Sequence, residues 1–147
     1  VRENKMKYDD ASWHYGGEFP DDLPQEAGAI HTGMYLSWAL LNGLGGEIHL
    51  EESPEGLEEL RSQQITPAGF FLKYCDGKFT DEDLNELGNR FTAYYFDFQN
   101  GQYINEYSSL FGESLPSLYH VEDSWENYII VSTLLDQRFS AWKTKNS

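Results

Sequence analysis

The chain has 147 residues, of which 39% are hydrophobic and 16% aromatic, which is enough for one domain with its own core. Ten basic and 25 acidic residues give a net charge of −15, which argues against nucleic acid and anionic lipid as partners. The single cysteine excludes an internal disulfide, and no apolar run of about 18 residues is present to span a membrane.

The N-terminal part of the chain combines acidic and aromatic residues with turn formers. We expect residues 1–7 to be disordered or introduced by cloning, and residues 8–147 to form a single α-helical domain. Residues 8–28 contain six carboxylates, one histidine and no lysine or arginine. Their glycines and prolines predict an ordered but irregular arm. Its aromatic side chains would be costly to leave in water, so we expect them to pack on the body of the domain: Tyr8, Trp13, Tyr15 and Phe19.

The first long helix is predicted over residues 25–42. Apolar residues occupy much of its circumference, which is typical of a central, buried helix. A run of glycines beginning at Gly43 ends it. Residues 47–51 then alternate between polar and apolar side chains, which predicts a short edge strand.

Two shorter helices begin with the same pair of residue types. Ser53-Pro54 and Thr66-Pro67 each place a hydroxyl at the N-cap and a proline at the first helical position. The second helix carries Cys75 among large aromatic residues. This setting predicts a buried, small apolar side chain rather than a nucleophile.

A further helix is predicted from Thr80 to about Asp97, because acids follow the threonine and apolar residues repeat at helical spacing. The Asn100-Gly101 pair favours a competing interpretation, a β-hairpin around that turn. The helix is the preferred prediction because the apolar stripe starts well before the turn.

The last predicted helix starts at Asp123 or Ser124 and ends in basic residues, which suit a helix C-terminus. The chain is therefore predicted to be mainly α, with about five or six helices and little β structure.

No catalytic motif is present: phosphate-binding loops, paired zinc-ligand spacings and nucleophile elbows are all absent from the sequence. None of the four histidines has another histidine or a cysteine three or four residues away, so we expect no metal or other cofactor. A distributed site remains an alternative, as in a metal-dependent hydrolase. It would use His14 and His31 with nearby acids such as Asp9, Asp10 and Glu26. Against it, Ser12 beside the two aspartates favours turn or capping chemistry.

Two acidic and aromatic segments, residues 8–28 and 119–128, are candidates for binding a basic protein. Carboxylates attract cationic partners, and aromatic rings can anchor their arginine and lysine side chains. Simple solubility would explain the sign of the charge, but not two stretches, residues 8–60 and 91–137, without a single lysine or arginine. The predicted contact residues are Asp9, Asp10, Trp13, His14, Glu18, Asp21, Asp22, Glu51, Glu52, Glu55, Glu58, Glu59, Glu122, Asp123, Trp125 and Glu126.

Three sequence segments carry a family resemblance. They are KYDDASWHYGGEFPDDLPQEAGAIHTGMYLSWALLNGL, CDGKFTDEDLNELGNRF and LPSLYHVEDSWENY. The chain resembles a family of small acidic bacterial proteins known only as a domain of unknown function. That resemblance implies no catalytic residues, but it suggests a cytoplasmic immunity protein that neutralises a secreted toxin by covering a basic surface. The alternatives are the metal-dependent hydrolase and a housekeeping interaction module.

Overall fold

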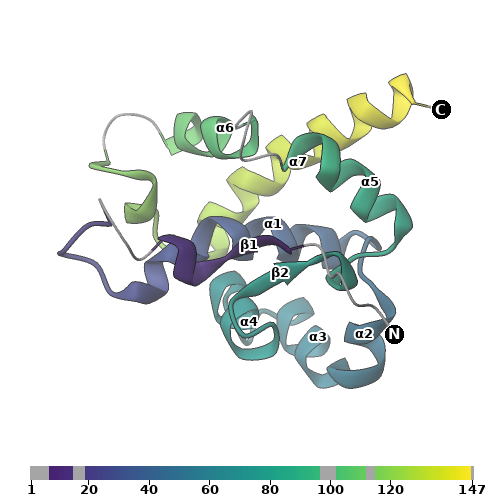
Figure 1. The fold of residues 1–147 in the computed structure, drawn as a ribbon, viewed down its shortest axis with the longest axis horizontal. Helices are drawn as coiled ribbons and strands as arrows, with labels where there is room; N and C mark the ends of the chain where they lie inside the picture. The colour runs from purple at the N-terminus through teal and green to yellow at the C-terminus, as the bar shows by residue number, and fades with distance from the viewer. Residues whose placement is uncertain (1–6, 15–18, 97–101, 112–114, 147) are drawn as a thin grey trace.

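Helix α1 (Ile30–Leu41) runs through the middle of the molecule (Figure 1). The computed structural model describes residues 7–14, 19–96, 102–111 and 115–146. Ten successive residues of α1, from Ile30 to Ala39, are buried, because the helix is apolar around nearly its whole circumference. The predicted central helix is thus confirmed, although residues 25–29 form a 3-10 turn, η2 (Gln25–Ala29), ahead of it.

Three helices lie on one side of α1 in Figure 1: α2 (Glu47–Glu52), α3 (Pro54–Arg61) and α4 (Pro67–Tyr74). Both proline-led helices begin where the sequence predicted. The Thr66 hydroxyl accepts a hydrogen bond from the Gly69 amide at 3.1 Å, which caps α4. Helix α4 lies close against α1, as Gly33 shows: a Cβ added there would stand only 2.8 Å from the Cα of Ala68.

Three further helices lie on the other side of α1: α5 (Glu86–Tyr95), α6 (Gln102–Phe111) and α7 (Trp125–Lys145). Ser124 caps α7 by accepting a hydrogen bond from the Asn127 amide at 3.1 Å, as one of the two predicted starts requires. With seven α-helices and one pair of short strands in the described residues, the fold is mainly α, as predicted.

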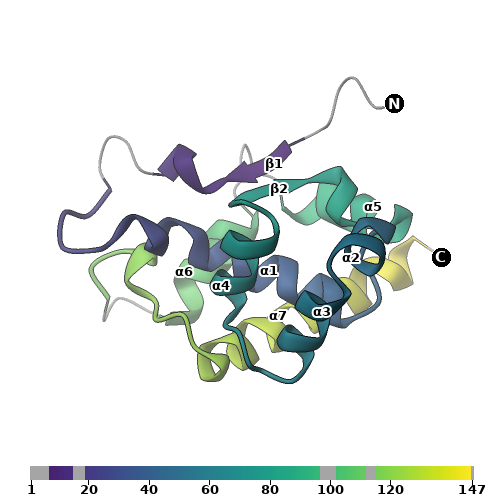
Figure 2. The same ribbon diagram turned by 90° about the horizontal axis from the view of Figure 1, so that it is seen from below.

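The strands β1 (Lys7–Asp10) and β2 (Lys78–Thr80) pair antiparallel, with Asp9 opposite Phe79. In Figure 2 this pair lies along the upper edge of the molecule, with α1 below it and α7 further below. The arm is therefore more regular than predicted, and η1 (Ala11–His14) continues it. Tyr8 packs on Phe79 at a ring separation of 4.9 Å, whereas Trp13 is 56% exposed, contrary to expectation.

Two local predictions are wrong. Residues 47–51 form helix α2 rather than a strand, because a run this short fits either structure. The capping box at Thr80 forms but holds only η3 (Asp81–Asp83). Leu84 is extended and forms an isolated β-bridge with Gly45, which interrupts the predicted helix. Helix α5 therefore starts later, after the N-cap residue Asn85.

The hairpin alternative is also wrong where it can be checked, because its second strand falls in helix α6. Its turn at residues 100–101 lies outside the described residues. No helix in the described part of the chain combines the length and apolarity needed to cross a bilayer.

Candidate functional site

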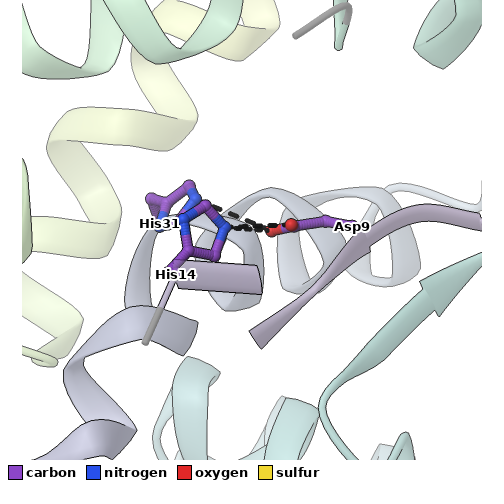
Figure 3. Close-up of side chains that lie close together, drawn as sticks. All are labelled: Asp9, His14 and His31. Carbon is purple, nitrogen blue, oxygen red and sulfur yellow. Dashed lines mark hydrogen bonds and ion pairs between the residues drawn. The ribbon is translucent and has the colours of Figure 1, made fainter. Parts of the chain in front are cut away.

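Three elements that are separate in the sequence bring Asp9, His14 and His31 together. Strand β1 carries Asp9, η1 carries His14, and the first turn of α1 carries His31. Figure 3 shows both imidazole rings facing the carboxylate of Asp9. One ligand atom from each residue can be chosen so that all three lie within 4.8 Å of one another.

The Asp9 carboxylate is the centre of this cluster and is fully buried. Its Oδ1 lies 2.9 Å from Nε2 of His14, and its Oδ2 lies 3.6 Å from Nε2 of His31. The hydroxyl of Thr32 donates a short hydrogen bond to Oδ2. These contacts fix the orientation of a charge that would be costly to bury without partners.

The ring of His14 is oriented from its other side by Tyr119, which lies in η4 (Leu118–His120). The distance between Nδ1 of His14 and Oη of Tyr119 is 2.8 Å. The hydroxyl of Tyr103 donates to the backbone carbonyl of His31 at 2.6 Å, which fixes the start of α1. His14 keeps 11% of its side chain exposed, while His31 keeps 1%.

The charge state of His31 suits metal binding. Burial lowers the pKa of His31 to about 4, against the opposing effect of Asp9, so the ring is neutral at pH 7. A neutral imidazole and an ionised carboxylate are the forms that bind metal ions. Tetrahedral zinc with bonds of about 2.1 Å would need its ligand atoms about 3.4 Å apart. Measured to the same oxygen, Oδ2 of Asp9, the distances from Nε2 of His14 and Nε2 of His31 are 3.2 and 3.6 Å, on either side of that value.

A cavity of about 440 Å³ has Tyr119, the partner of His14, in its wall, while Asp9, His14 and His31 do not line it. The lining is mainly apolar and includes three carboxylates: Glu26, Glu122 and Asp123. Beside it, Nε2 of His120 lies 2.9 Å from the carboxylate of Asp22. The two acidic segments of the sequence, residues 8–28 and 119–128, therefore meet at this cavity.

The other predicted site residues of the arm take several positions. Asp10 is buried and accepts hydrogen bonds from the amide and hydroxyl of Ser12 at 3.0 and 2.8 Å, which confirms the turn chemistry. Asp21 is exposed, and Glu18 lies outside the described residues. Asp9 and Asp10 are both buried, so neither lies on the exposed surface of the arm.

The acids of α2 and α3 form a separate patch. Glu51, Glu52, Glu55 and Glu58 are exposed there, while Glu59 is half-buried and accepts a hydrogen bond from the Tyr74 hydroxyl at 2.7 Å. These residues belong to other elements than the cluster and do not line the cavity at Tyr119.

Near the start of α7, two predicted contact residues are used inside the fold. Asp123 accepts a hydrogen bond from the Ala68 amide at 3.2 Å, and the Trp125 indole donates to the Ile65 carbonyl at 3.2 Å. Glu122 and Glu126 are exposed.

Sequence reasoning named Asp9, His14 and His31 among the candidates for a distributed site, and the structure brings those three together without Asp10 or Glu26. It missed Thr32 and Tyr119. Thr32 directly follows His31, which is a local signal for a second polar group on the same turn of helix. Tyr119 is 105 positions from His14, so no spacing could reveal it.

A family model described as "Domain of unknown function (DUF7832)" matches residues 7–121. The matched region covers most of the chain and includes the histidine cluster and Tyr119. The chain belongs to this family. No curated protein and no solved structure is significantly similar to it.

Proposed function

We propose that this member of the DUF7832 family is a metal-dependent hydrolase whose divalent ion is held by Asp9, His14 and His31. The observation that carries the proposal is the convergence of two imidazole nitrogens and one carboxylate oxygen from three separate elements. Two histidines and one carboxylate are a common ligand set of catalytic zinc, and they leave coordination positions open. An ion bound there would supply a Lewis acid and an activated water.

The surroundings of the three ligands support the proposal. Histidine ligands are usually oriented by a hydrogen bond at the second ring nitrogen, and Tyr119 is placed to accept one from His14. Thr32 holds the carboxylate of Asp9 from the other side. The cavity of about 440 Å³ that has Tyr119 in its wall is a candidate space for a substrate, although the three ligands do not line it themselves.

The first experiment measures zinc and cobalt binding by calorimetry on the wild-type chain, the His14→Ala variant and the His120→Ala variant. His120 is the matched control, because it also pairs with an aspartate but stands at the edge of the cavity. We expect the wild type and His120→Ala to bind alike and His14→Ala to lose one equivalent of metal. The proposal fails if His14→Ala binds as the wild type does.

A second experiment separates a hydrolytic centre from a closed structural one. In the cobalt-loaded protein, azide should alter the d–d absorption if a coordination position is open. Zinc-loaded protein should also hydrolyse activated nitrophenyl ester or phosphate substrates, and His14→Ala should lose this activity. If azide does not change the d–d spectrum, the site binds metal without an open position, and the hydrolase proposal is ruled out.

A second candidate function is the neutralisation of a bacterial toxin in the cytoplasm by covering its basic surface. The meeting of Asp22, Glu26, Glu122 and Asp123 around one cavity favours it, because arginine or lysine side chains of a partner would find both apolar and anionic contacts there.

The test of this candidate is a binding measurement against the product of the neighbouring gene, with rescue from its toxicity. We expect the affinity to fall steeply with salt and Asp21→Lys to slow association. Glu86→Lys is the control, since it changes the net charge equally from the exposed start of α5. Association that is independent of salt would contradict the electrostatic mechanism.

A further inference from the structure

A second group of metal-ligating side chains comes from other elements than those of the Asp9–His14–His31 cluster. It consists of His49 from α2, Cys75 at the C-cap of α4 and Asp83 from η3. Their ligand atoms lie within 4.8 Å of one another. His49 and Asp83 are buried, and Cys75 is partly buried.

The carboxylate of Asp83 has a different partner on each oxygen. Oδ2 accepts the amide of Thr80 at 2.8 Å, which completes the capping box of η3. Oδ1 faces the other way, 2.9 Å from Nε2 of His49 and 3.9 Å from Sγ of Cys75. The ring of Phe70, 5.8 Å from that of His49, closes one side of the group with apolar surface. The cap therefore directs one oxygen at the imidazole and the thiol.

We propose that His49, Cys75 and Asp83 form a zinc site, with Nε2, Sγ and Oδ1 as ligands. Nitrogen, sulfur and carboxylate oxygen are the donors that zinc takes in proteins. When the ion binds, the thiol of Cys75 releases its proton to solvent and the sulfur bonds to zinc as thiolate. The sulfur distinguishes this site from the Asp9–His14–His31 cluster, which offers only nitrogen and oxygen.

His49 also lines a pocket of about 230 Å³ together with Gly45 and Gly46. Of the three ligands, His49 is the one that lines this pocket. Because the three ligands come from α2, α4 and η3, a bound zinc would hold these elements together.

Cobalt absorption spectroscopy tests the site, because cobalt bound to a thiolate shows charge-transfer absorption in the near ultraviolet. Cys75 is the only cysteine of the chain, so such absorption can arise only there. We expect the band in the wild type, its loss on adding zinc, and its absence from Cys75→Ser. His49→Gln should weaken cobalt binding more than about tenfold, since losing even an outer-shell partner costs that much.

Circular dichroism of each variant checks that the chain is folded. The site is ruled out if folded wild-type protein saturated with cobalt lacks the band, or if His49→Gln binds cobalt unchanged. The His14→Ala variant keeps this site separate from the proposed hydrolytic centre: we expect it to retain the charge-transfer band at full intensity.

Discussion

The imidazole rings of His14 and His31 stand nearly perpendicular, at 88°, with their centroids 4.6 Å apart. This edge-to-face arrangement lets both Nε2 atoms face the carboxylate of Asp9 without the rings overlapping. The favourable contact between ring edge and ring face also stabilises the pair before any ion binds. The ligand geometry is therefore formed in advance, which lowers the cost of ordering side chains on binding.

The hydroxyl of Tyr119 should affect the metal without touching it. Tyr119→Phe removes the hydrogen-bond partner of His14 Nδ1 and leaves the ring in place. We expect zinc affinity to fall by about 10- to 100-fold, as for other outer-shell partners of metal-bound histidine. Calorimetric titration measures this. Tyr94→Phe is the control, because Tyr94 is an exposed tyrosine on α5, away from the cluster, and should bind zinc as the wild type does.

Asp9→Asn should remove the stabilisation that metal gives. In the wild type, zinc at 100 times its Kd would add about 2.7 kcal/mol to the free energy of unfolding. Asparagine has nearly the same shape as aspartate, but an NH2 group replaces one of the two carboxylate oxygens and faces either Thr32 or His14. We expect it to lose about 1–3 kcal/mol without metal. Thermal denaturation with and without zinc checks both effects, and an equal rise in Tm for both proteins would contradict the ligand assignment.

Glu106 should make stability depend on pH in the acidic range. Its carboxylate accepts hydrogen bonds from Arg138 at 2.5 and 3.0 Å and from the Tyr95 hydroxyl at 2.6 Å. The hydrogen bond from Arg138, and then that from Tyr95, lower the pKa of Glu106 below its usual value despite partial burial. The stabilisation is therefore complete above the unfolded-state pKa of about 4.3 and is lost as pH falls through the lower folded-state value.

The matching variant is Glu106→Gln, which we expect to cost about 1 kcal/mol at pH 7. Urea denaturation at several pH values should show the gap between wild type and variant closing in acid. Glu122→Gln, an exposed glutamate ahead of α7, serves as the control and should change stability little at any pH. A gap that stays constant down to pH 3 would argue against the ion pair as its source.

Gly33→Ala should destabilise the contact between α1 and α4. Its Cβ would lie 2.8 Å from the Cα of Ala68 and 2.9 Å from the carbonyl oxygen of Pro67, both of them backbone atoms that cannot rotate away. We expect a loss of about 1–3 kcal/mol, although alanine is the better helix former. Ser140→Ala places an alanine on the exposed face of α7 and should be near neutral. Unchanged chemical denaturation of Gly33→Ala would show that the helices can separate freely.

The sequence predicted the elements whose cause is local. The prolines that begin α3 and α4, and the capping hydroxyls of Thr66 and Ser124, act within one turn of the residues they order, whereas the Ser53 hydroxyl forms no cap. Predictions failed where a residue far away in the sequence determines the local secondary structure. Leu84 has helical neighbours but is drawn into a bridge with Gly45, and β1 exists because β2, about 70 positions along the chain, pairs with it.

The candidate site was predictable only in part for the same reason. Composition pointed to His14, His31 and the acids of the arm as possible partners. It could not separate Asp9, which faces α1, from Asp10, which turns back to Ser12. Neighbouring side chains of a strand point to opposite faces, so that choice depends on how β1 docks. The group of His49, Cys75 and Asp83 was harder still to predict. Its members come from three elements, and residue spacing in the sequence does not show how those elements pack together.

Among the described residues, strand β1 pairs with one strand, β2, and the segment of β1 and η1 brings Asp9 and then His14 to a helix that begins at residue 30. An ion bound by Asp9, His14 and His31 would link the N-terminal segment to helix α1. Peeling the strand away would then release the metal, and removing the metal would loosen the strand. Metal binding at the site and docking of the N-terminal segment would thus be thermodynamically coupled.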